Sequence, residues 1–328
     1  MLATSTDPLF NRYNLYASAI KLLRRDEDSA LYQMTCPDGT GLMTRFMLFP
    51  GVDLFFNDFH AFHCQESGGH SAVDALEINH CRRGRYECRL TNGFCSYLGE
   101  NDLAATIYNT PRQMGAFTLG YYEGVEIMLD LPVASQSLSA LMGDALDLAA
   151  LKARLTTHHD CAIFRESPAI HRICDDFYTA RGPHRRAYYR IKVLELLFFL
   201  THTPIDTAAS NVPAYPEAFV AKIKTIAEAL RRDLQAEHTL KELAATYDLG
   251  LTRLKSGFKA VYGKTPAAYR REYRLQHAAT LLKRAELPIA AIAEAVGYDN
   301  FSKFSEAFKA YTGLTPRDYR RKSSDSLE

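Results

Sequence analysis

Residues 240–321 read LKELAATYDLGLTRLKSGFKAVYGKTPAAYRREYRLQHAATLLKRAELPIAAIAEAVGYDNFSKFSEAFKAYTGLTPRDYRR, and this stretch contains nearly the same sequence twice. FKA at 258–260 recurs at 308–310, TP at 265–266 recurs at 315–316, and YRR at 269–271 recurs at 319–321, all at an offset of 50. Upstream, Leu240, Leu243 and Ala244 recur as Ile289, Ile292 and Ala293 at an offset of 49, so one residue is gained in between. Self-similarity of this density predicts a structural repeat.

Each copy predicts two short helices separated by a turn. In the first copy, Thr239 and Glu242 have the spacing of a capping box, which starts a helix. The segment 248–250 (DLG) is the expected turn, in which Gly250 relieves backbone strain. The helix over 252–261 should bury residues at helical spacing, namely Leu254, Phe258 and Val261.

The second copy follows the same plan. Pro288 marks a helix start, residues 297–298 form the turn, and Asp299 and Asn300 are available to cap the next helix. The residues that we expect to be buried here are Ile289, Ile292, Val296, Phe304 and Phe308. The sequence therefore predicts two helix-turn-helix units in tandem.

A single long helix is predicted between the two copies, over 266–284, because Pro266 suits a first helical turn and no other Pro or Gly follows. About 20 residues at roughly 1.5 Å each give a length near 30 Å. This length is close to the roughly 34 Å of one turn of B-DNA, so such a helix can hold two recognition helices in successive major grooves.

The stretch from 258 to 320 resembles the DNA-binding domain of the AraC/XylS family of bacterial transcription regulators, and both copies match. The resemblance implies recognition of asymmetric double-stranded DNA sites, with activation of transcription beside RNA polymerase. Mapped position by position, with the outward lysines of both helices, it places DNA contacts on Thr252, Arg253, Lys255, Ser256, Lys259, Ser302, Lys303, Glu306 and Lys309. The alternative for these helices is a pair with merely solvated charges.

Glu306 departs from the family pattern, in which many members carry Arg. A carboxylate can accept a hydrogen bond from a cytosine amine but repels phosphates. The second unit is therefore expected to read DNA weakly or differently from the first.

Length and charge fit a two-domain regulator. The chain has 328 residues, which suggests two domains. From Pro216 onward there are 20 Lys and Arg against 14 Asp and Glu, a net charge of +6, while the remainder carries −5. A basic C-terminal part fits contact with phosphates. The apolar run 196–200 is too short to cross a membrane, and we expect a cytoplasmic protein without a membrane partner.

Alternating strands are predicted from 42 to 131. Residues 76–81 and 86–90 alternate between apolar and polar, with an expected turn at Arg83-Gly84. Asn92-Gly93 then predicts a hairpin to a strand over 94–98, and 115–130 offers two more strands. Many short strands at this spacing predict a small β-barrel. Before them, residues 13–24 are expected to form a short helix.

This region resembles, more loosely, the cupin-like N-terminal domain of many AraC/XylS members, on LEINHC at 76–81, GRY at 84–86 and YLG at 97–99. The resemblance implies a barrel that binds a small-molecule effector. The candidate effector-binding residues are Arg82, Arg85, Arg89, Phe55 and Tyr86. The alternatives are a solvated arginine-rich hairpin surface and aromatic residues that simply form the core.

Catalysis, cofactors and metals are not expected. The seven cysteines are an odd number and include no CxxC pair, which favours reduced thiols buried in a sheet. The regular spacing of Cys81, Cys88 and Cys95 leaves a metal or redox-sensing site as the alternative. A metal-dependent cupin enzyme, a cysteine-based sensor and an alkyl-acceptor repair protein are the competing functions, each fused to the DNA-binding domain.

The pattern becomes helical again from 136 to 202. The last segment, 185–200, has an apolar face with Lys192 and Glu195 opposite, and such helices can form a homodimer or cover the edge of the barrel. We therefore predict an α+β chain: a cupin-like effector domain (1–135), a helical dimerisation region (136–202), a linker (203–216) and a double helix-turn-helix domain (217–328).

Overall fold

The computed structural model describes residues 20–64, 74–90, 92–107, 115–155, 161–165, 167–203, 213–235, 239–284 and 287–324. The chain divides into two compact units, residues 1–217 and 218–328. The expectation of a helix at 13–24 is wrong for its second part, since residues 20–25 form a strand, and its first part lies outside the described residues.

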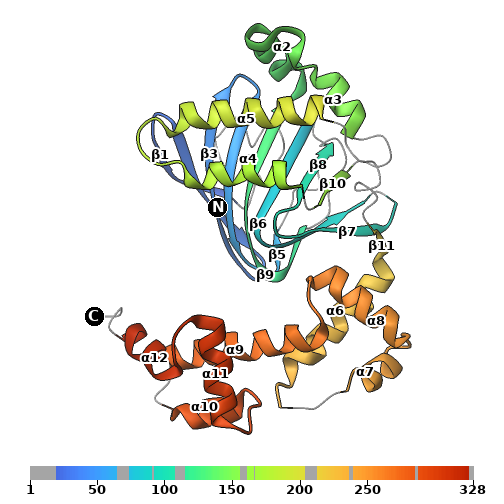
Figure 1. Cartoon of the computed structure of the whole chain (residues 1–328), viewed down its shortest axis with the longest axis vertical. Helices are drawn as coiled ribbons and strands as arrows, with labels where there is room; N and C mark the ends of the chain where they lie inside the picture. The colour runs from blue at the N-terminus through green and yellow to red at the C-terminus, as the bar shows by residue number, and fades with distance from the viewer. Residues whose placement is uncertain are drawn as a thin grey trace, which may run out of the picture. The chain divides into compact units, whose positions relative to one another are not determined.

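The N-terminal unit is built on a mainly antiparallel sheet (Figure 1). Its strands follow the order β1-β2-β3-β4-β9-β6-β7-β11, with β8 and β5 joined to β6 and β9 at the side and β10 joined to β8. Among the described residues β1 pairs with β2 alone, and this sheet-rich unit is consistent with the predicted cupin-like domain. The bounds are β1 Ile20–Arg25, β2 Ser29–Cys36, β3 Gly39–Phe49, β4 Val52–His60, β5 His63–Cys64, β6 Ala75–Arg89, β7 Phe94–Leu98, β8 Leu103–Ile107, β9 Gly115–Asp130, β10 Cys161–Phe164 and β11 Tyr215–Pro216.

Strand β6 is one continuous strand where the sequence predicted two. The register against β9 shifts on both sides of Gly84, so the expected turn at Arg83-Gly84 is a bulge. Gly84 has φ of +93°, and a Cβ there would lie 2.3 Å from the carbonyl oxygen of Tyr121 on β9. Strand β9 is likewise unbroken, whereas two strands were expected over 115–130. The predicted hairpin at Asn92-Gly93 is confirmed between β6 and β7.

The two faces of the sheet have different surroundings. One face packs against α4 (Pro168–Thr179) and α5 (Arg185–His202), which lie side by side across the sheet (Figure 1), in a core that also includes α2 (Leu131–Met142) and α3 (Leu148–Leu155). Aromatic and aliphatic side chains such as Phe46, Leu54 and Ile127 fill this core. The other face buries Tyr32, Met43 and the polar pair Arg45 and Asp53, whose Nε and Oδ1 atoms are 2.9 Å apart. The helices therefore cover a face of the sheet.

Helix α5 buries the apolar face that its sequence predicts, with Val193, Leu196 and Leu200 inside. Lys192 was expected opposite this apolar face, but it is only 7% exposed. Its ammonium group pairs with Asp176 of α4 at 2.8 Å and with Glu195 of its own helix. The lysine stem is buried between the helices while its charge is neutralised by carboxylates at the rim.

The C-terminal unit is all helical, as the sequence predicts. The helices are α6 Glu217–Arg232, α7 Leu240–Thr246, α8 Leu251–Tyr262, α9 Pro266–Arg284, α10 Ile289–Ala295, α11 Phe301–Thr312 and α12 Pro316–Ser324. The helix expected at 266–284 is confirmed with the same bounds. Leu254, Phe258 and Val261 are buried in the first copy, and Ile292, Val296, Phe304 and Phe308 in the second, while Ile289 is only partly buried.

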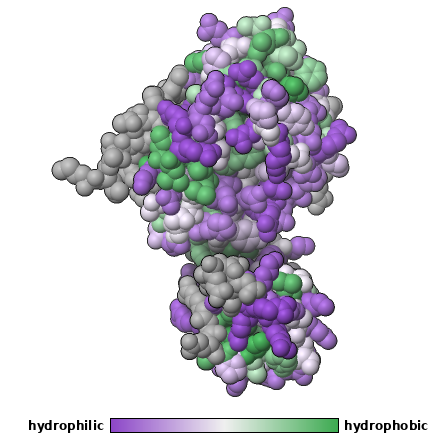
Figure 2. Space-filling model, turned by 90° about the vertical axis from the view of Figure 1, so that its left-hand side faces the viewer, coloured by the Kyte–Doolittle hydropathy of each residue, from purple (hydrophilic) through white to green (hydrophobic). Residues whose placement is uncertain are grey.

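The surface of the larger, N-terminal unit is mostly hydrophilic, but hydrophobic side chains gather in patches on the side shown in Figure 2. Within the described ranges, several large apolar residues are exposed, among them Met47 on β3, Leu141 on α2, and Ile191 and Phe198 on α5.

The residues of β11 belong to the end of the expected linker, yet they pair with β7, with Tyr215 opposite Cys95.

Candidate nucleic-acid interface and ligand pocket

Helix α8 presents the polar face that the first copy predicts for DNA contact. Its apolar residues recur at helical spacing and are buried, which turns Thr252, Arg253, Lys255, Ser256 and Lys259 to the surface, and all five are exposed. The Arg253 guanidinium lies over the Phe219 ring of α6, 4.8 Å from its centroid. This contact limits the freedom of a long side chain at the N-terminal end of the helix.

Phe219 reaches α8 because Gly257 has no side chain. A Cβ at Gly257 would lie 2.3 Å from the Phe219 ring. Sequence reasoning missed this pairing. The signal was a glycine inside an otherwise helical pattern, which often marks close packing.

Helix α11 presents the equivalent face of the second copy. Ser302, Lys303, Glu306 and Lys309 are all exposed on it. The predicted cap is confirmed at Asn300, whose side-chain oxygen accepts a hydrogen bond from the backbone N–H of Lys303 at 3.0 Å. The N-cap of α8 is Gly250, which offers no side chain.

The turns of the two copies differ by the residue that the sequence gains. Asp248 (φ 50°) and Gly297 (φ 81°) occupy the same left-handed position, each followed by a residue whose N–H bonds the carbonyl five residues back. One residue, Leu249, then precedes the N-cap Gly250, whereas two precede the N-cap Asn300. The expectation that Gly250 relieves strain is wrong, since its φ is −65° and the left-handed residue is Asp248.

Helix α9 joins the two copies, and a hydrogen bond links it to Leu234, two residues after the end of α6. The Arg274 guanidinium donates to the carbonyl oxygen of Leu234 at 2.9 Å and lies over the Tyr298 ring. Leu234 itself packs against the core of the second copy. A Cβ at Gly297 would lie 2.3 Å from the Leu234 oxygen, so only glycine fits here. These contacts hold the second turn against the linking helix.

A pocket of about 440 Å³ lies in the N-terminal unit between the helix-covered face of the sheet and the α4–α5 turn. Its apolar walls come from both layers, with Phe46 and Phe56 from strands and Phe177, Tyr178 and Tyr189 from helices. Three guanidinium groups and two carboxylates line it: Arg82, Arg181, Arg185, Asp58 and Glu123.

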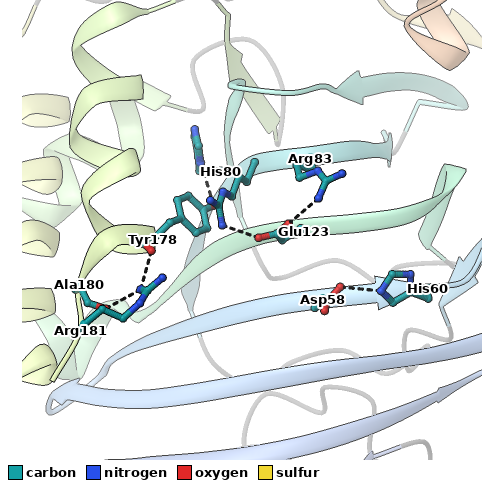
Figure 3. A network of polar contacts seen from close by, with 9 residues as sticks. Asp58, His60, His80, Arg83, Glu123, Tyr178, Ala180 and Arg181 are labelled. Carbon is teal, nitrogen blue, oxygen red and sulfur yellow. Dashed lines mark hydrogen bonds and ion pairs between the residues drawn. The ribbon is translucent and has the colours of Figure 1, made fainter. Parts of the chain in front are cut away.

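The polar groups beside the pocket form the network drawn in Figure 3. The Arg82 guanidinium donates to Glu123 at 2.7 Å and lies 4.4 Å from the centroid of the Tyr178 ring. The Tyr178 hydroxyl lies 3.2 Å from Nδ1 of His80 on β6. Burial and the nearby His171 lower the pKa of His80 to about 4, so its imidazole is neutral at neutral pH.

The five effector candidates from the sequence are not brought together. Arg82 lines the pocket, whereas Arg85 lies over the Tyr97 ring and Arg89 pairs with Glu87. Phe55 and Tyr86 belong to the core on the other face of the sheet. The pocket residues that the sequence did not single out come from strands and helices far apart in the chain, and no local pattern identifies them.

No disulfide bond joins any of the seven cysteines, all of which are described, and six of the seven are buried. Burial and the nearby Asp38 raise the pKa of Cys36 to about 11, and burial also raises the pKa of Cys81 and Cys174. Such thiols are protonated at neutral pH and weakly nucleophilic.

Within the described ranges, no group of three or more His, Cys, Asp or Glu could hold a metal ion. No described helix is both long and apolar enough to span a membrane.

Two helix-turn-helix units on one connecting helix define the class of the C-terminal unit, and comparison with known proteins agrees. Residues 243–322 match a family model described as a helix-turn-helix domain. An AraC-like transcription regulator of Streptomyces antibioticus is 38% identical over 143 residues, 44% of this chain and 45% of that protein. The transcriptional activator RclR of Escherichia coli is 38% identical over 84 residues, 26% of this chain and 30% of that protein.

The C-terminal unit is therefore a helix-turn-helix domain of the AraC type. Among solved structures, the C-terminal domain of AraT from Geobacillus stearothermophilus is 32% identical, with a TM-score of 0.30 and coverage of 31% of this chain and 84% of that one. The matched region is less than half the length of the Streptomyces and Escherichia coli relatives.

Proposed function

We propose that this protein is a sequence-specific, double-stranded-DNA-binding transcription regulator, acting mainly as an activator beside RNA polymerase. The observation that carries the proposal is the pair of exposed polar helix faces, α8 and α11, built by the same packing on either side of α9. Helix α9 has 19 residues, and at roughly 1.5 Å each it is close in length to one turn of B-DNA. The nine surface residues named above are the proposed DNA contacts.

A small-molecule effector and a homodimer complete the proposal. The pocket offers a volume typical of small-molecule sites. Helix α5 carries the residues Tyr188, Ile191, Glu195, Phe198 and His202 on its exposed side, spaced alternately by three and four as in a helix–helix seam. Effector binding changes DNA binding only if the effector binds one arrangement of the protein better than the other.

The first experiment selects DNA sites from a random double-stranded pool with the full-length protein and then measures their affinity by fluorescence anisotropy at fixed salt. Arg253→Ala and Lys255→Ala should each weaken binding to the selected site by about 1–3 kcal/mol if these residues contact a base. Each should weaken binding more than Lys303→Ala does in the second copy.

Lys222→Ala is the matched control, because it removes an exposed positive charge from α6, outside both recognition helices. It should change affinity by less than about 0.5 kcal/mol. If the selection enriches no sequence from the pool, sequence-specific DNA binding is contradicted. Equal losses for Lys222→Ala and Lys255→Ala would remove the assignment of α8 as the reading helix.

A further inference from the structure

The pocket of the N-terminal unit combines an aromatic interior with cationic groups around it. Phe46 contacts Phe56 and Tyr189 with ring centroids 5.9 and 5.0 Å apart, and Phe56 lies 6.1 Å from Tyr178. Each ring therefore touches the next, and together they form a continuous aromatic surface. Such a surface favours a ligand with an apolar body.

Guanidinium groups flank this aromatic surface on both sides. Arg82 lies over Tyr178 at one side, and Arg185 lies over Phe46 at the other, 5.1 Å from the ring centroid. Arg82 is neutralised by Glu123 at 2.7 Å. Arg185 is half-buried and has no carboxylate within ion-pair distance among the described residues.

Arg181 adds a second such charge at the same end. Its guanidinium donates to the backbone carbonyls of Tyr178 and Ala180, both at 2.8 Å, and none of its contacts within the described part of the chain is a carboxylate. Arg181, Arg185 and Tyr189 all line the pocket, and the two arginines lower the pKa of the Tyr189 phenol against the larger, raising effect of burial. Two cations thus converge at one end of an aromatic cavity.

We propose that the pocket binds an organic carboxylate with an apolar body, whose carboxylate is held by Arg185 and Arg181 and whose body lies on Phe46, Phe56 and Tyr189. A planar guanidinium binds a carboxylate through paired hydrogen bonds, more strongly than it binds a neutral group. An organic cation is repelled by the same pair.

The site lies on the helix-covered face of the sheet, away from the second core that contains Phe55 and Tyr122. Helix α5 forms one wall through Arg185 and Tyr189, and the same helix exposes Tyr188 and Ile191 on its outer side. A ligand that holds the start of α5 against β3 therefore acts on the helix that we propose for dimer contact. This consequence for regulation rests on the proposed function, whereas the binding itself does not.

The test is calorimetric titration of the full-length protein without DNA. The probes are benzoate and octanoate, which separate an aromatic from an aliphatic body, with benzamide as the neutral analogue, benzylamine as the cation and acetate as the acid without a body. We expect at least one of the two acids to bind, and to bind about tenfold or more tightly than benzamide. Acetate and benzylamine should not bind measurably.

Arg185→Gln should weaken the binding of the acid by about tenfold to a hundredfold, and Arg181→Gln should weaken it less, because its side chain is more exposed. Arg172→Gln is the matched control, since it removes an exposed arginine of α4 that does not line the pocket. Far-UV circular dichroism verifies that each variant is folded.

Two outcomes would overturn the proposal. One is binding of neither acid at about 1 mM, the weak end of specific affinity. The other is binding that Arg185→Gln leaves unchanged while the variant is folded. Neither outcome bears on DNA recognition, which the site selection described above measures separately, so failure of this inference and failure of the proposed function are distinguishable.

Discussion

At the residue scale, the two copies of the repeat place different residues at the same backbone position. The left-handed residue of the turn is Asp248 in the first copy and Gly297 in the second. The sequence repeat identifies both turns, but it cannot say which residue of each turn has positive φ, because Gly250 also fits a turn. The buried residues were easier to predict, since Leu254, Phe258 and Phe304 each recur at helical spacing.

We predict that Gly297→Ala destabilises the C-terminal unit more than Gly313→Ala does. Both glycines have positive φ, +81° and +76°, so both substitutions carry a left-handed backbone cost of about 1–2 kcal/mol. Only the Cβ at 297 also meets the Leu234 oxygen and the Arg274 guanidinium, whereas nothing lies within 4 Å of a Cβ at 313.

The difference should be about 1 kcal/mol or more in the free energy of unfolding, as overpacking typically costs. Urea unfolding of the full chain followed by far-UV circular dichroism measures it, since the chain has no Trp. Equal losses for the two variants would show that the contact with Leu234 does not restrain the turn.

At the element scale, the two recognition helices begin differently. Helix α11 starts at Asn300, which caps it with a side-chain hydrogen bond, while α8 starts at Gly250 and lacks one. The N-cap of α8 has φ of −65° and ψ of 140°, an extended conformation that Asn adopts without strain. The N-terminus of α8 is therefore less well capped than that of α11.

We predict that Gly250→Asn stabilises α8 by about 0.5 kcal/mol or more, because it adds the cap found at Asn300 and reduces the entropy of the unfolded chain. Nothing lies within 4 Å of a Cβ at position 250, so the new side chain meets no obstacle. Thermal unfolding of the full chain gives the sign. Gly250→Ala is the control, and since Ala cannot cap a helix it should stabilise less or not at all. Equal stabilisation by both would exclude capping as the cause.

Strand assignment shows where sequence patterns fail at this scale. The alternation on both sides of Gly84 predicts strands correctly, yet a glycine between two alternating segments marks a turn or a bulge equally well. The pairing of β6 with β9 decides in favour of the bulge, and β9 lies more than twenty residues further along the chain. No local pattern could identify that partner.

At the scale of the whole molecule, the exposed side of α5 is where we expect two copies of the chain to meet. Ile191 is 63% exposed and Phe198 is 45% exposed, on a helix whose opposite side is fully buried. The sequence predicted the buried side from its apolar periodicity, but it gave Lys192 the wrong environment. The carboxylate of Asp176 that neutralises Lys192 comes from another helix.

We predict that Ile191→Asp weakens self-association by about tenfold or more, because a buried carboxylate without a partner is strongly unfavourable. Size-exclusion chromatography with light scattering over a concentration series measures it. Leu141→Asp, at a residue of similar exposure on α2, is the control and should leave self-association unchanged. If Leu141→Asp dissociates the protein and Ile191→Asp does not, the contact surface is at α2.

The distribution of the buried thiols has a practical consequence. All seven cysteines lie between residues 36 and 174, and the C-terminal unit has none. Because the thiolate is the reactive form and six of the seven cysteines are buried, a thiol-specific reagent reaches those six mainly when the N-terminal unit transiently opens. The rate at which these six thiols are modified therefore measures the transient opening of the N-terminal unit alone, because the C-terminal unit, which we propose binds DNA, has no cysteine. A small molecule that binds the N-terminal unit should lower this modification rate, whereas DNA should lower it only if the two units are energetically coupled.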